Sequence, residues 1–311
     1  MKKIQRKRSL FDLLKDYFYI KKNNELLINI LIKQKNNIKF YDNLAVPAFD
    51  YISSCIIING AYEKRELEAL SLKLKNKFKK KILLDIGAHI GNHSIFLSSY
   101  FKKVFSFEPN KFTYKFLKFN KDFKKNIFAF NYGAANVNKN MIMSHNANNL
   151  GANKIIEKKL TSPISSGIYS FKNKDYNVAI FKRFDDLKFL KKERIGAIKL
   201  DLENYEIEAL LGMKNLIIKN KPVIIFENSF NNNDKKIYDF LMNIGYNYLY
   251  LLKKPEWFIN NKYPKLIRNF LKLFEIILFK APKYKFDFQI SDSLSERHFG
   301  AHISIMSFYK L

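Results

Sequence analysis

Residues 82–92 read ILLDIGAHIGN, and residues 104–110 read VFSFEPN. Each apolar run ends in an acid, which is typical of parallel strands whose carboxyl ends form a nucleoside site. Glycines at positions 87 and 91 let the backbone approach a ligand closely, because neither carries a side chain. Glu108 follows Gly87 by 21 residues, about where the next strand places a carboxylate beside a ribose. The stretch therefore predicts a site for an adenosine-containing cofactor.

The spacing of these glycines narrows the choice of cofactor. A dinucleotide site needs Gly-x-Gly-x-x-Gly, so that a pyrophosphate can sit on backbone amides, whereas this chain has Gly87-x-x-x-Gly91. Asp85, just before the turn, would repel a phosphate but suits a ligand with an ammonium and a sulfonium group. These features favour S-adenosylmethionine over NAD. The alternative is an ordinary strand-to-helix turn in which Asp85 only caps the helix.

Composition limits the partners that we expect. The 311-residue chain carries 56 Lys and Arg against 28 Asp and Glu, a formal charge of +28. Such a charge is typical of proteins that bind nucleic acid or anionic membranes. Only seven of the basic residues are Arg, however, and lysines are spread along the whole chain. We therefore do not expect nucleic acid as the main partner.

The sequence also indicates a location. A single cysteine, Cys55, argues against a disulfide-stapled fold and favours a reducing compartment. Charged residues follow the basic N-terminus and interrupt any signal peptide, and no apolar run reaches the roughly 18 residues that span a bilayer. We expect a cytoplasmic protein. A basic apolar helix predicted at 265–280 either lies against the inner face of the membrane or packs on the core or on a second subunit of a homo-oligomer.

Hydrophobic periodicity divides the chain into three parts. Residues 1–60 form an N-terminal helical region whose helices end near Asn37 and whose last part, 38–60, looks extended and irregular. Residues 61–250 are the core, and residues 251–311 are a C-terminal extension with the basic apolar helix and a final strand. Strands that alternate with helices in the core predict an α/β fold, with a mostly parallel central sheet and helices on both faces.

Short apolar runs mark the strands of the core. They are residues 82–86, 104–108, 127–131, 195–200 and 223–226. Polar residues stand at the carboxyl end of each run, where the ligand of a parallel sheet binds: Asp85, Glu108, Asn131, Asp201 and Glu227. Residues 136–185 are rich in Asn, Ser and Gly and predict an inserted hairpin region.

Helical spacing and capping residues place the helices of the core. A helix from about residue 63 to 75 presents one stripe of leucines: Leu67, Leu70 and Leu74. Asn92 and Asn110 are the expected N-caps of the next two helices. The helix capped by Asn110 has an apolar stripe of three phenylalanines: Phe112, Phe116 and Phe119. In a later helix, three residues are expected to mark the inner face: Ile207, Leu210 and Leu211. A last helix from about residue 234 to 243 ends at Gly245.

Five short motifs together resemble one known family. They are GAYE at 60–63, DIGAHIGNHS at 85–94, FEPN at 107–110, AA at 134–135 and IKLDLENYE at 198–206. Their order and spacing over residues 60–230 resemble the FkbM-type S-adenosylmethionine-dependent methyltransferases. The resemblance implies a class I, Rossmann-like methyltransferase fold and O-methyl transfer to sugars or other hydroxylated small molecules.

Two positions depart from the family pattern. The family usually has Asn where this chain has His89, and Gly where it has Asn204. His89 can still donate a hydrogen bond to the carboxylate of the cofactor, whereas Asn204 narrows the space beside Asp201. His89 and His93 have a spacing that is found at metal sites, but no third ligand is nearby, so we expect no metal.

The candidate cofactor-binding residues lie around the first three strands. They are Asp85, Gly87, Ala88, His89, Gly91, Asn92, Glu108, Asn110 and Asn131. Asp85 and the backbone around the two glycines are expected to hold the methionine end of S-adenosylmethionine, and Glu108 its ribose hydroxyls. Asn131 is expected to reach the adenine edge, although Asn at a strand tip is also a turn former.

Methyl transfer to an alcohol benefits from a general base. Asp201 and Glu203 are the first candidates, because their strand ends beside the methyl group in this fold. Their alternative role is cofactor contact or helix capping. His145 is a second candidate, because the inserted region that contains it would lie over the site. No Asp/Asn-Pro-Pro-Tyr motif follows this strand, which argues against methylation of the exocyclic amine of a base.

The leading hypothesis is therefore an S-adenosylmethionine-dependent O-methyltransferase that acts on a sugar hydroxyl of a surface polysaccharide or its precursor. The net charge leaves an RNA methyltransferase as an alternative. The departures at His89 and Asn204 leave a third hypothesis, a non-catalytic scaffold that keeps the fold and binds no cofactor.

Overall fold

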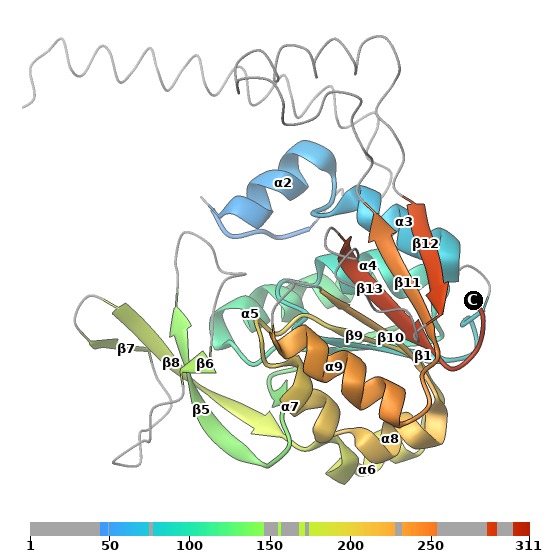
Figure 1. The fold of residues 1–311 in the computed structure, drawn as a ribbon. Helices are drawn as coiled ribbons and strands as arrows, with labels where there is room; N and C mark the ends of the chain where they lie inside the picture. The colour runs from blue at the N-terminus through green and yellow to red at the C-terminus, as the bar shows by residue number, and fades with distance from the viewer. Residues whose placement is uncertain are drawn as a thin grey trace, which may run out of the picture.

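The structure is a computed structural model, drawn as a ribbon in Figure 1. It describes residues 44–48, 50–74, 77–145, 155–156, 168–171, 174–227, 232–253, 285–290 and 301–311. The helices expected before Asn37 and the basic apolar helix expected at 265–280 lie outside these ranges. Among the described residues, no helix has the length and apolar character needed to cross a membrane.

One large sheet forms the centre of the molecule. Its strands in the described residues are β1 (Ile82–Ile86), β2 (Lys103–Phe107), β3 (Ile127–Phe130), β9 (Ile195–Leu200), β10 (Val223–Glu227), β11 (Tyr248–Lys253), β12 (Lys285–Ile290) and β13 (Ala301–Ser307). They lie in the order β12-β11-β13-β10-β9-β1-β2-β3. The five strands from β10 to β3 are parallel, and β13 runs antiparallel to both β10 and β11.

The order of the strands positions the site. The chain runs outward from β1 through β2 to β3, and then from β9 to β10 in the opposite direction. The direction therefore changes between β1 and β9, which pair in parallel. Ligands of open α/β sheets bind at the carboxyl ends of the strands at such a switch point.

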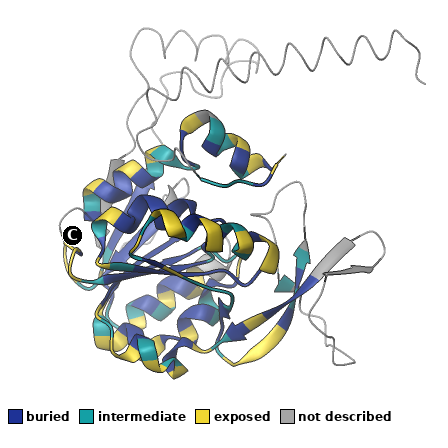
Figure 2. Ribbon diagram, turned by 180° about the vertical axis from the view of Figure 1, so that it is seen from behind, coloured by how far each residue is buried: buried dark blue, intermediate teal, exposed yellow. Residues whose placement is uncertain are grey.

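Helices cover both faces of this sheet. The helices on one face are α3 (Lys64–Leu74), α4 (Asn92–Leu97) and α5 (Lys111–Asn120), and those on the other are α7 (Glu206–Leu211), α8 (Lys214–Asn220) and α9 (Asn232–Asn243). A hydrophobic cluster lies on each face of the sheet. On one face, Leu83 and Val104 pack with α3 and α4. On the other, Leu84 and Ile198 pack with α7, α8 and α9. The central strands are buried on both sides (Figure 2), which explains their nearly continuous apolar sequences.

A second, smaller sheet follows β3. It contains β4 (Gly133–Ala134), β5 (Lys139–His145), β6 (Ile155–Ile156), β7 (Ile168–Phe171) and β8 (Lys174–Lys182). Strands β5 and β8 pair antiparallel over their whole length, and the sheet projects from the side of the main body (Figure 1). The expectation of an inserted hairpin region at 136–185 is thus confirmed.

The main elements of the core were predicted closely. Strands β1 and β9 have the expected bounds, and β2, β3 and β10 differ from them by a single residue. Helix α3 buries the expected leucine stripe, and Gly245 after α9 has a φ of 95°. Strands β12 and β13, from the segment expected as a C-terminal extension, join the main sheet, and β13 lies between β10 and β11.

One segment that was expected to be extended is helical. Residues Tyr51–Asn59 form α2, which begins at Asp50 and ends at Gly60. The Asp50 carboxylate accepts a hydrogen bond from the backbone N–H of Ser53 at 2.9 Å, and Gly60 has a φ of 82°. The prediction was wrong because the apolar run has no one-sided periodicity, so the two caps were the only helical signal.

The helices also differ in detail from the sequence prediction. The residues that α5 buries are Thr113, Leu117 and Asn120, and none of them belongs to the apolar stripe noted in the sequence. Helix α7 buries Ala209 and Leu210, whereas Leu211 is 41% exposed. Gly91 rather than Asn92 occupies the N-cap of α4, and no side chain caps that helix.

Candidate active site

A cavity of about 260 Å³ lies at the carboxyl ends of β1, β2, β9 and β10. Tyr51 and Tyr62, from α2 and the loop that follows it, line one side of the cavity. Met143, Ile155 and Phe181, from the second sheet, line another. The switch point of the main sheet is therefore the floor of a pocket whose walls come from segments outside that sheet.

The cavity is acidic, although the protein as a whole is strongly basic. Among the described residues that line it, the acids are Glu63, Glu108, Asp201, Glu203 and Glu227, and the one lysine is Lys199. The formal charge of the chain is +28. A cavity with this excess of carboxylates favours a cationic or neutral ligand over an anionic one.

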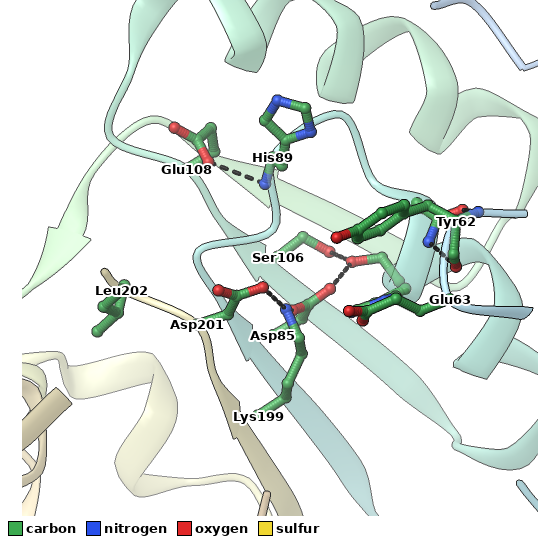
Figure 3. Close-up of polar contacts among 12 residues, drawn as sticks. Tyr62, Glu63, Asp85, His89, Ser106, Glu108, Lys199, Asp201 and Leu202 are labelled. Atoms are coloured by element: carbon green, nitrogen blue, oxygen red, sulfur yellow. Dashed lines mark hydrogen bonds and ion pairs between the residues drawn. The ribbon is translucent and has the colours of Figure 1, made fainter. Parts of the chain in front are cut away.

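A polar network begins in the floor of the cavity and continues beneath it (Figure 3). The Nζ of Lys199 lies 3.1 Å from Oδ2 of Asp201 and 3.4 Å from Oδ1 of Asp85. On the other side, the Ser94 hydroxyl donates to Asp85 Oδ2 at 2.5 Å and lies 2.6 Å from the Ser106 hydroxyl. The network links β1, β2, α4 and β9 below the point where a ligand would bind.

Within this network, Lys199 and Asp201 hold each other in the ionised form. Burial lowers the pKa of Lys199, but the carboxylates of Asp201 and Asp85 outweigh it and raise the pKa above its ordinary value. Desolvation raises the pKa of Asp201, but the Lys199 ammonium outweighs it and lowers the pKa. Asp201 is therefore a stable anion and a weak base at neutral pH.

Asp85 does not lie where the sequence suggested. Its side chain is fully buried, and it is not among the residues that line the cavity. Its neutralising partner is Lys199, which the sequence interpretation missed. A usable signal existed, because Lys199 is the one charged residue of an otherwise apolar strand and precedes Asp201 by two positions. Residues two apart in a strand point to the same face.

Glu108 occupies the position expected of a ribose-binding carboxylate. It lines the cavity, and its two oxygens accept backbone hydrogen bonds from His89 and Asn110, both at 2.8 Å. The Thr113 side chain also donates a hydrogen bond to this carboxylate. A carboxylate has about four lone-pair sites, so Glu108 can still accept a bond from a ligand hydroxyl. Burial raises the pKa of Glu108 to about 7, although these three donors oppose the shift.

Both departures from the family pattern fall on residues with left-handed backbone. His89 has a φ of 52° and Asn204 a φ of 77°. Asn and Gly, the usual family residues at these positions, are the types that adopt this conformation most easily. The substitutions therefore keep the backbone at some cost in strain. Burial lowers the pKa of His89 to about 4, and its buried Nε2 has no hydrogen-bond partner in the described part of the chain.

The two glycines of the first turn make room for protein rather than for a ligand. A Cβ on Gly87 would lie 1.9 Å from the carbonyl oxygen of Asp201, and a Cβ on Gly91 would lie 2.9 Å from Leu117. Gly87 and Ala88 do line the cavity, and both donate backbone hydrogen bonds to the Phe107 carbonyl at 3.0 Å. The sequence predicted a close approach to a ligand, whereas the atoms that these glycines leave room for belong to Asp201 and Leu117.

A strained loop before α3 reaches the cavity and was not predicted as part of the site. The side-chain amide of Asn92 holds the backbone of Tyr62 by two bonds, of 3.1 and 3.0 Å. Glu63 follows with a φ of 54°, and its Oε2 lies 3.3 Å from Nε2 of His93. Asn92 thus positions Tyr62 and Glu63, and the GAYE motif supplies a wall of the cavity.

Of the remaining predicted residues, some line the cavity and others only bond to residues near it. Glu203 lines the cavity and has a φ of 51°. Asn110 caps α5, and the Asn131 amide donates to the Glu108 carbonyl at 2.9 Å; neither residue is among those that line the cavity. His145 is the last residue of β5, and its side chain lies outside what the structure describes. Among the described residues, no group of three or more His, Cys, Asp or Glu is placed to hold a metal ion.

The strand order and the acid-lined cavity at its switch point define a class I methyltransferase. Residues 85–248, more than half of the chain, match the family model described as the methyltransferase FkbM domain. The chain belongs to the FkbM methyltransferase family, and S-adenosylmethionine is accordingly its cofactor.

Several solved structures are similar to this chain at low sequence identity. A methyltransferase FkbM from Methylobacillus flagellatus is 16% identical with a TM-score of 0.37, and the match covers 53% of this chain and 38% of that one. A precorrin-6y C5,15-methyltransferase from Geobacter metallireducens is 11% identical with a TM-score of 0.38, over 88% of this chain and 95% of that one. An rRNA methylase from Streptococcus thermophilus is 10% identical with a TM-score of 0.39, over 80% and 96%. No curated protein matches the chain.

Proposed function

We propose that this methyltransferase transfers the methyl group of S-adenosylmethionine to a hydroxyl of a neutral carbohydrate, a surface polysaccharide or its precursor. The observation that carries the proposal is the acid-lined cavity at the carboxyl ends of β1, β2, β9 and β10. Carboxylates accept hydrogen bonds from vicinal hydroxyls, and they favour a ligand that carries a sulfonium and an ammonium group.

The residues near β1 and β2 fit the cofactor. Glu108 lines the cavity and can accept a hydrogen bond from a ribose hydroxyl, and the turn from Gly87 to His89 supplies the wall beside it. His89 is neutral at physiological pH and can donate a hydrogen bond to a carboxylate. When it is bound, S-adenosylmethionine supplies an activated methyl group. The protein contributes position and a suitable electrostatic environment.

The residues after β9 fit the acceptor. Asp201 is held as an anion by Lys199 at 3.1 Å, so its role is to accept a hydrogen bond from an acceptor hydroxyl and orient it. Glu203 also lines the cavity and is the better candidate for taking the proton that the hydroxyl loses. We expect Glu203→Gln to lower kcat at least tenfold with little change in cofactor affinity. Unchanged kcat would remove Glu203 from this role.

An RNA acceptor is the alternative that the charge of +28 favours. Five carboxylates around the cavity repel a phosphodiester, however, and so favour the carbohydrate. A steep salt dependence of binding to bulk RNA, together with methyl incorporation into that RNA, would support the alternative. A scaffold without activity predicts instead that calorimetry detects no binding of S-adenosylmethionine.

The acceptor can be tested in cells with and without the gene. We expect mass spectrometry of the surface carbohydrate to show the loss of one methyl increment when the gene is deleted. Restoring the wild-type gene should restore the increment, whereas a gene with Glu203→Gln should not. Identical carbohydrate spectra, with a lost methyl mark in RNA, would contradict the proposal.

A further inference from the structure

Helix α5 buries two polar residues and leaves aromatic residues exposed. The residues that it buries are Thr113, Leu117 and Asn120, two of which are polar. Four phenylalanines at helical spacing follow one side of α5 and the 3-10 turn after it (η2, Lys121–Phe123). We call them the phenylalanine stripe: Phe112, Phe116, Phe119 and Phe123. Phe112, Phe119 and Phe123 are 37%, 57% and 41% exposed. Scattered exposed apolar residues are ordinary, but a continuous aromatic row along a helix marks an interaction surface.

The stripe lies in a strongly basic segment. Residues 111–125 contain six lysines and a single acid, Asp122, which already pairs with Lys121 at 2.6 Å. Lys111, Lys115 and Lys118 are exposed on the helix itself. Basic residues beside an exposed apolar row are the composition of a helix that lies in the interface of an anionic membrane.

We propose that this surface docks the protein on an anionic lipid bilayer, with the phenylalanine stripe inserted among the lipids and the lysines near the headgroups. Charge complementarity selects this occupant. Lysine is a point charge without the bidentate geometry of Arg, which suits a diffuse negative surface. The proposal goes beyond methyl transfer and does not depend on the identity of the acceptor.

Two other occupants fit the same surface less well. A second copy of the chain would bring six lysines against six others across a two-fold axis, and the like charges would repel. Single-stranded nucleic acid needs open ring faces for stacking. Here the rings pack edge to face in pairs, Phe112 with Phe116 at 5.5 Å and Phe119 with Phe123 at 5.6 Å.

The test is co-sedimentation of the full chain with vesicles. Binding is measured on pure phosphatidylcholine and on a mixture of phosphatidylcholine with phosphatidylglycerol at about 0.15 M salt. One variant removes the charge of α5 by Lys111→Gln, Lys115→Gln and Lys118→Gln. Its matched control removes the same charge from exposed residues of α8 and α9 on the opposite face: Lys214→Gln, Lys235→Gln and Lys236→Gln.

A second pair of variants tests the aromatic contribution. Phe119→Ser with Phe123→Ser is compared with Leu211→Ser and Ile218→Ser, which have similar exposure of 41% and 46% on the other face. Thermal unfolding of each variant accompanies the vesicle assay. If another part of this chain covered the stripe, the Phe→Ser pair would lower the unfolding temperature and leave vesicle binding unchanged.

We expect wild type and both controls to bind the anionic vesicles and not to bind the neutral vesicles. The lysine variant should bind about a hundredfold more weakly, and the phenylalanine variant about tenfold. Equal binding by test and control variants would overturn the proposal. Two further results would overturn it if the α5 variants kept their vesicle binding. One is loss of binding to poly-uridine RNA, and the other is conversion of a dimer to a monomer.

Discussion

Lys199 is the residue on which the geometry of the site most depends. It is the buried cation between Asp85 of β1 and Asp201 after β9, and it compensates two carboxylates that would otherwise repel each other. A buried charge that loses its partner costs more than the pair contributes, because the remaining charge stays desolvated. The floor of the cavity is therefore sensitive to this single side chain.

We predict that Lys199→Met lowers the free energy of unfolding by about 3 kcal/mol at pH 7. Urea unfolding at pH 7 measures the effect. The control Lys103→Met breaks a half-exposed pair with Glu193, at 2.8 Å, and should cost less than about 1 kcal/mol. Equal losses in the two variants would contradict the account.

Gly87 is required by the contact between two strands. Its φ is 80°, and a Cβ there would lie 1.9 Å from the Asp201 carbonyl. Gly87→Ala is expected to lower the free energy of unfolding by about 3 kcal/mol, since backbone strain and overpacking add. Gly245→Ala has a similar φ of 95° but meets only the Phe308 ring, at 2.9 Å, and should cost about 1 kcal/mol. If chemical denaturation found a larger loss of stability for Gly245→Ala than for Gly87→Ala, the contact between Gly87 and Asp201 would not explain why glycine is required at position 87.

For single residues, the sequence predicts where a side chain lies along a strand better than it predicts which residue that side chain contacts. Glu108 and Asp201 are found at strand ends, as expected, because an apolar run in a parallel sheet marks its own carboxyl end. The pairing of Asp85 with Lys199 joins residues 114 positions apart, and no local pattern contains it. Only the folded protein decides whether Asp85 is buried and whether its partner is the cofactor or another residue.

At the scale of elements, two contacts attach the loop before α3 to α4. The Asn92 amide makes two bonds to the backbone of Tyr62, and Glu63 lies 3.3 Å from His93. Tyr62 and Glu63 both line the cavity. We expect the Asn92 amide to fix the position of the loop, because it holds backbone atoms.

We expect Asn92→Ala to lower the free energy of unfolding by about 2 kcal/mol and to weaken binding of S-adenosylmethionine. Asn126→Ala is the matched control, because its amide also makes two bonds to backbone, at 2.8 and 3.2 Å, but far from the cavity. The two variants should lose similar stability in urea, and only Asn92→Ala should lose affinity in calorimetry. Equal affinities would show that the loop does not contact the cofactor.

The elements themselves could largely be read from periodicity, whereas the faces of the helices could not. Helix α3 has one apolar stripe, and the stripe is buried. Helix α5 has two candidate faces, and the structure buries the one that contains Thr113 and Asn120. Asn120 is useful there because its amide binds the carbonyls of Ala45 and Ile90, at 2.9 and 2.8 Å. Such long-range bonds decide the orientation of a helix, and the sequence does not display them.

On the scale of the whole molecule, charge is divided between surface and site. The chain has a formal charge of +28, yet the cavity carries an excess of carboxylates. A basic surface attracts polyanions such as RNA or anionic lipid, whereas an acidic cavity excludes phosphates from the reaction centre. We therefore expect the two regions to bind different partners, so the overall charge alone does not identify the acceptor.

The affinity for S-adenosylmethionine at pH 6 and pH 7.5 tests most directly whether the acid-lined cavity holds the cofactor. Burial raises the pKa of Glu108 to about 7, so the carboxylate ionises within this range. Because ribose hydroxyls donate best to the ionised form, calorimetry should find wild type binding about eightfold tighter at pH 7.5. Glu108→Gln should bind weakly and without this dependence. Equal affinity of wild type and Glu108→Gln at both pH values would contradict the account.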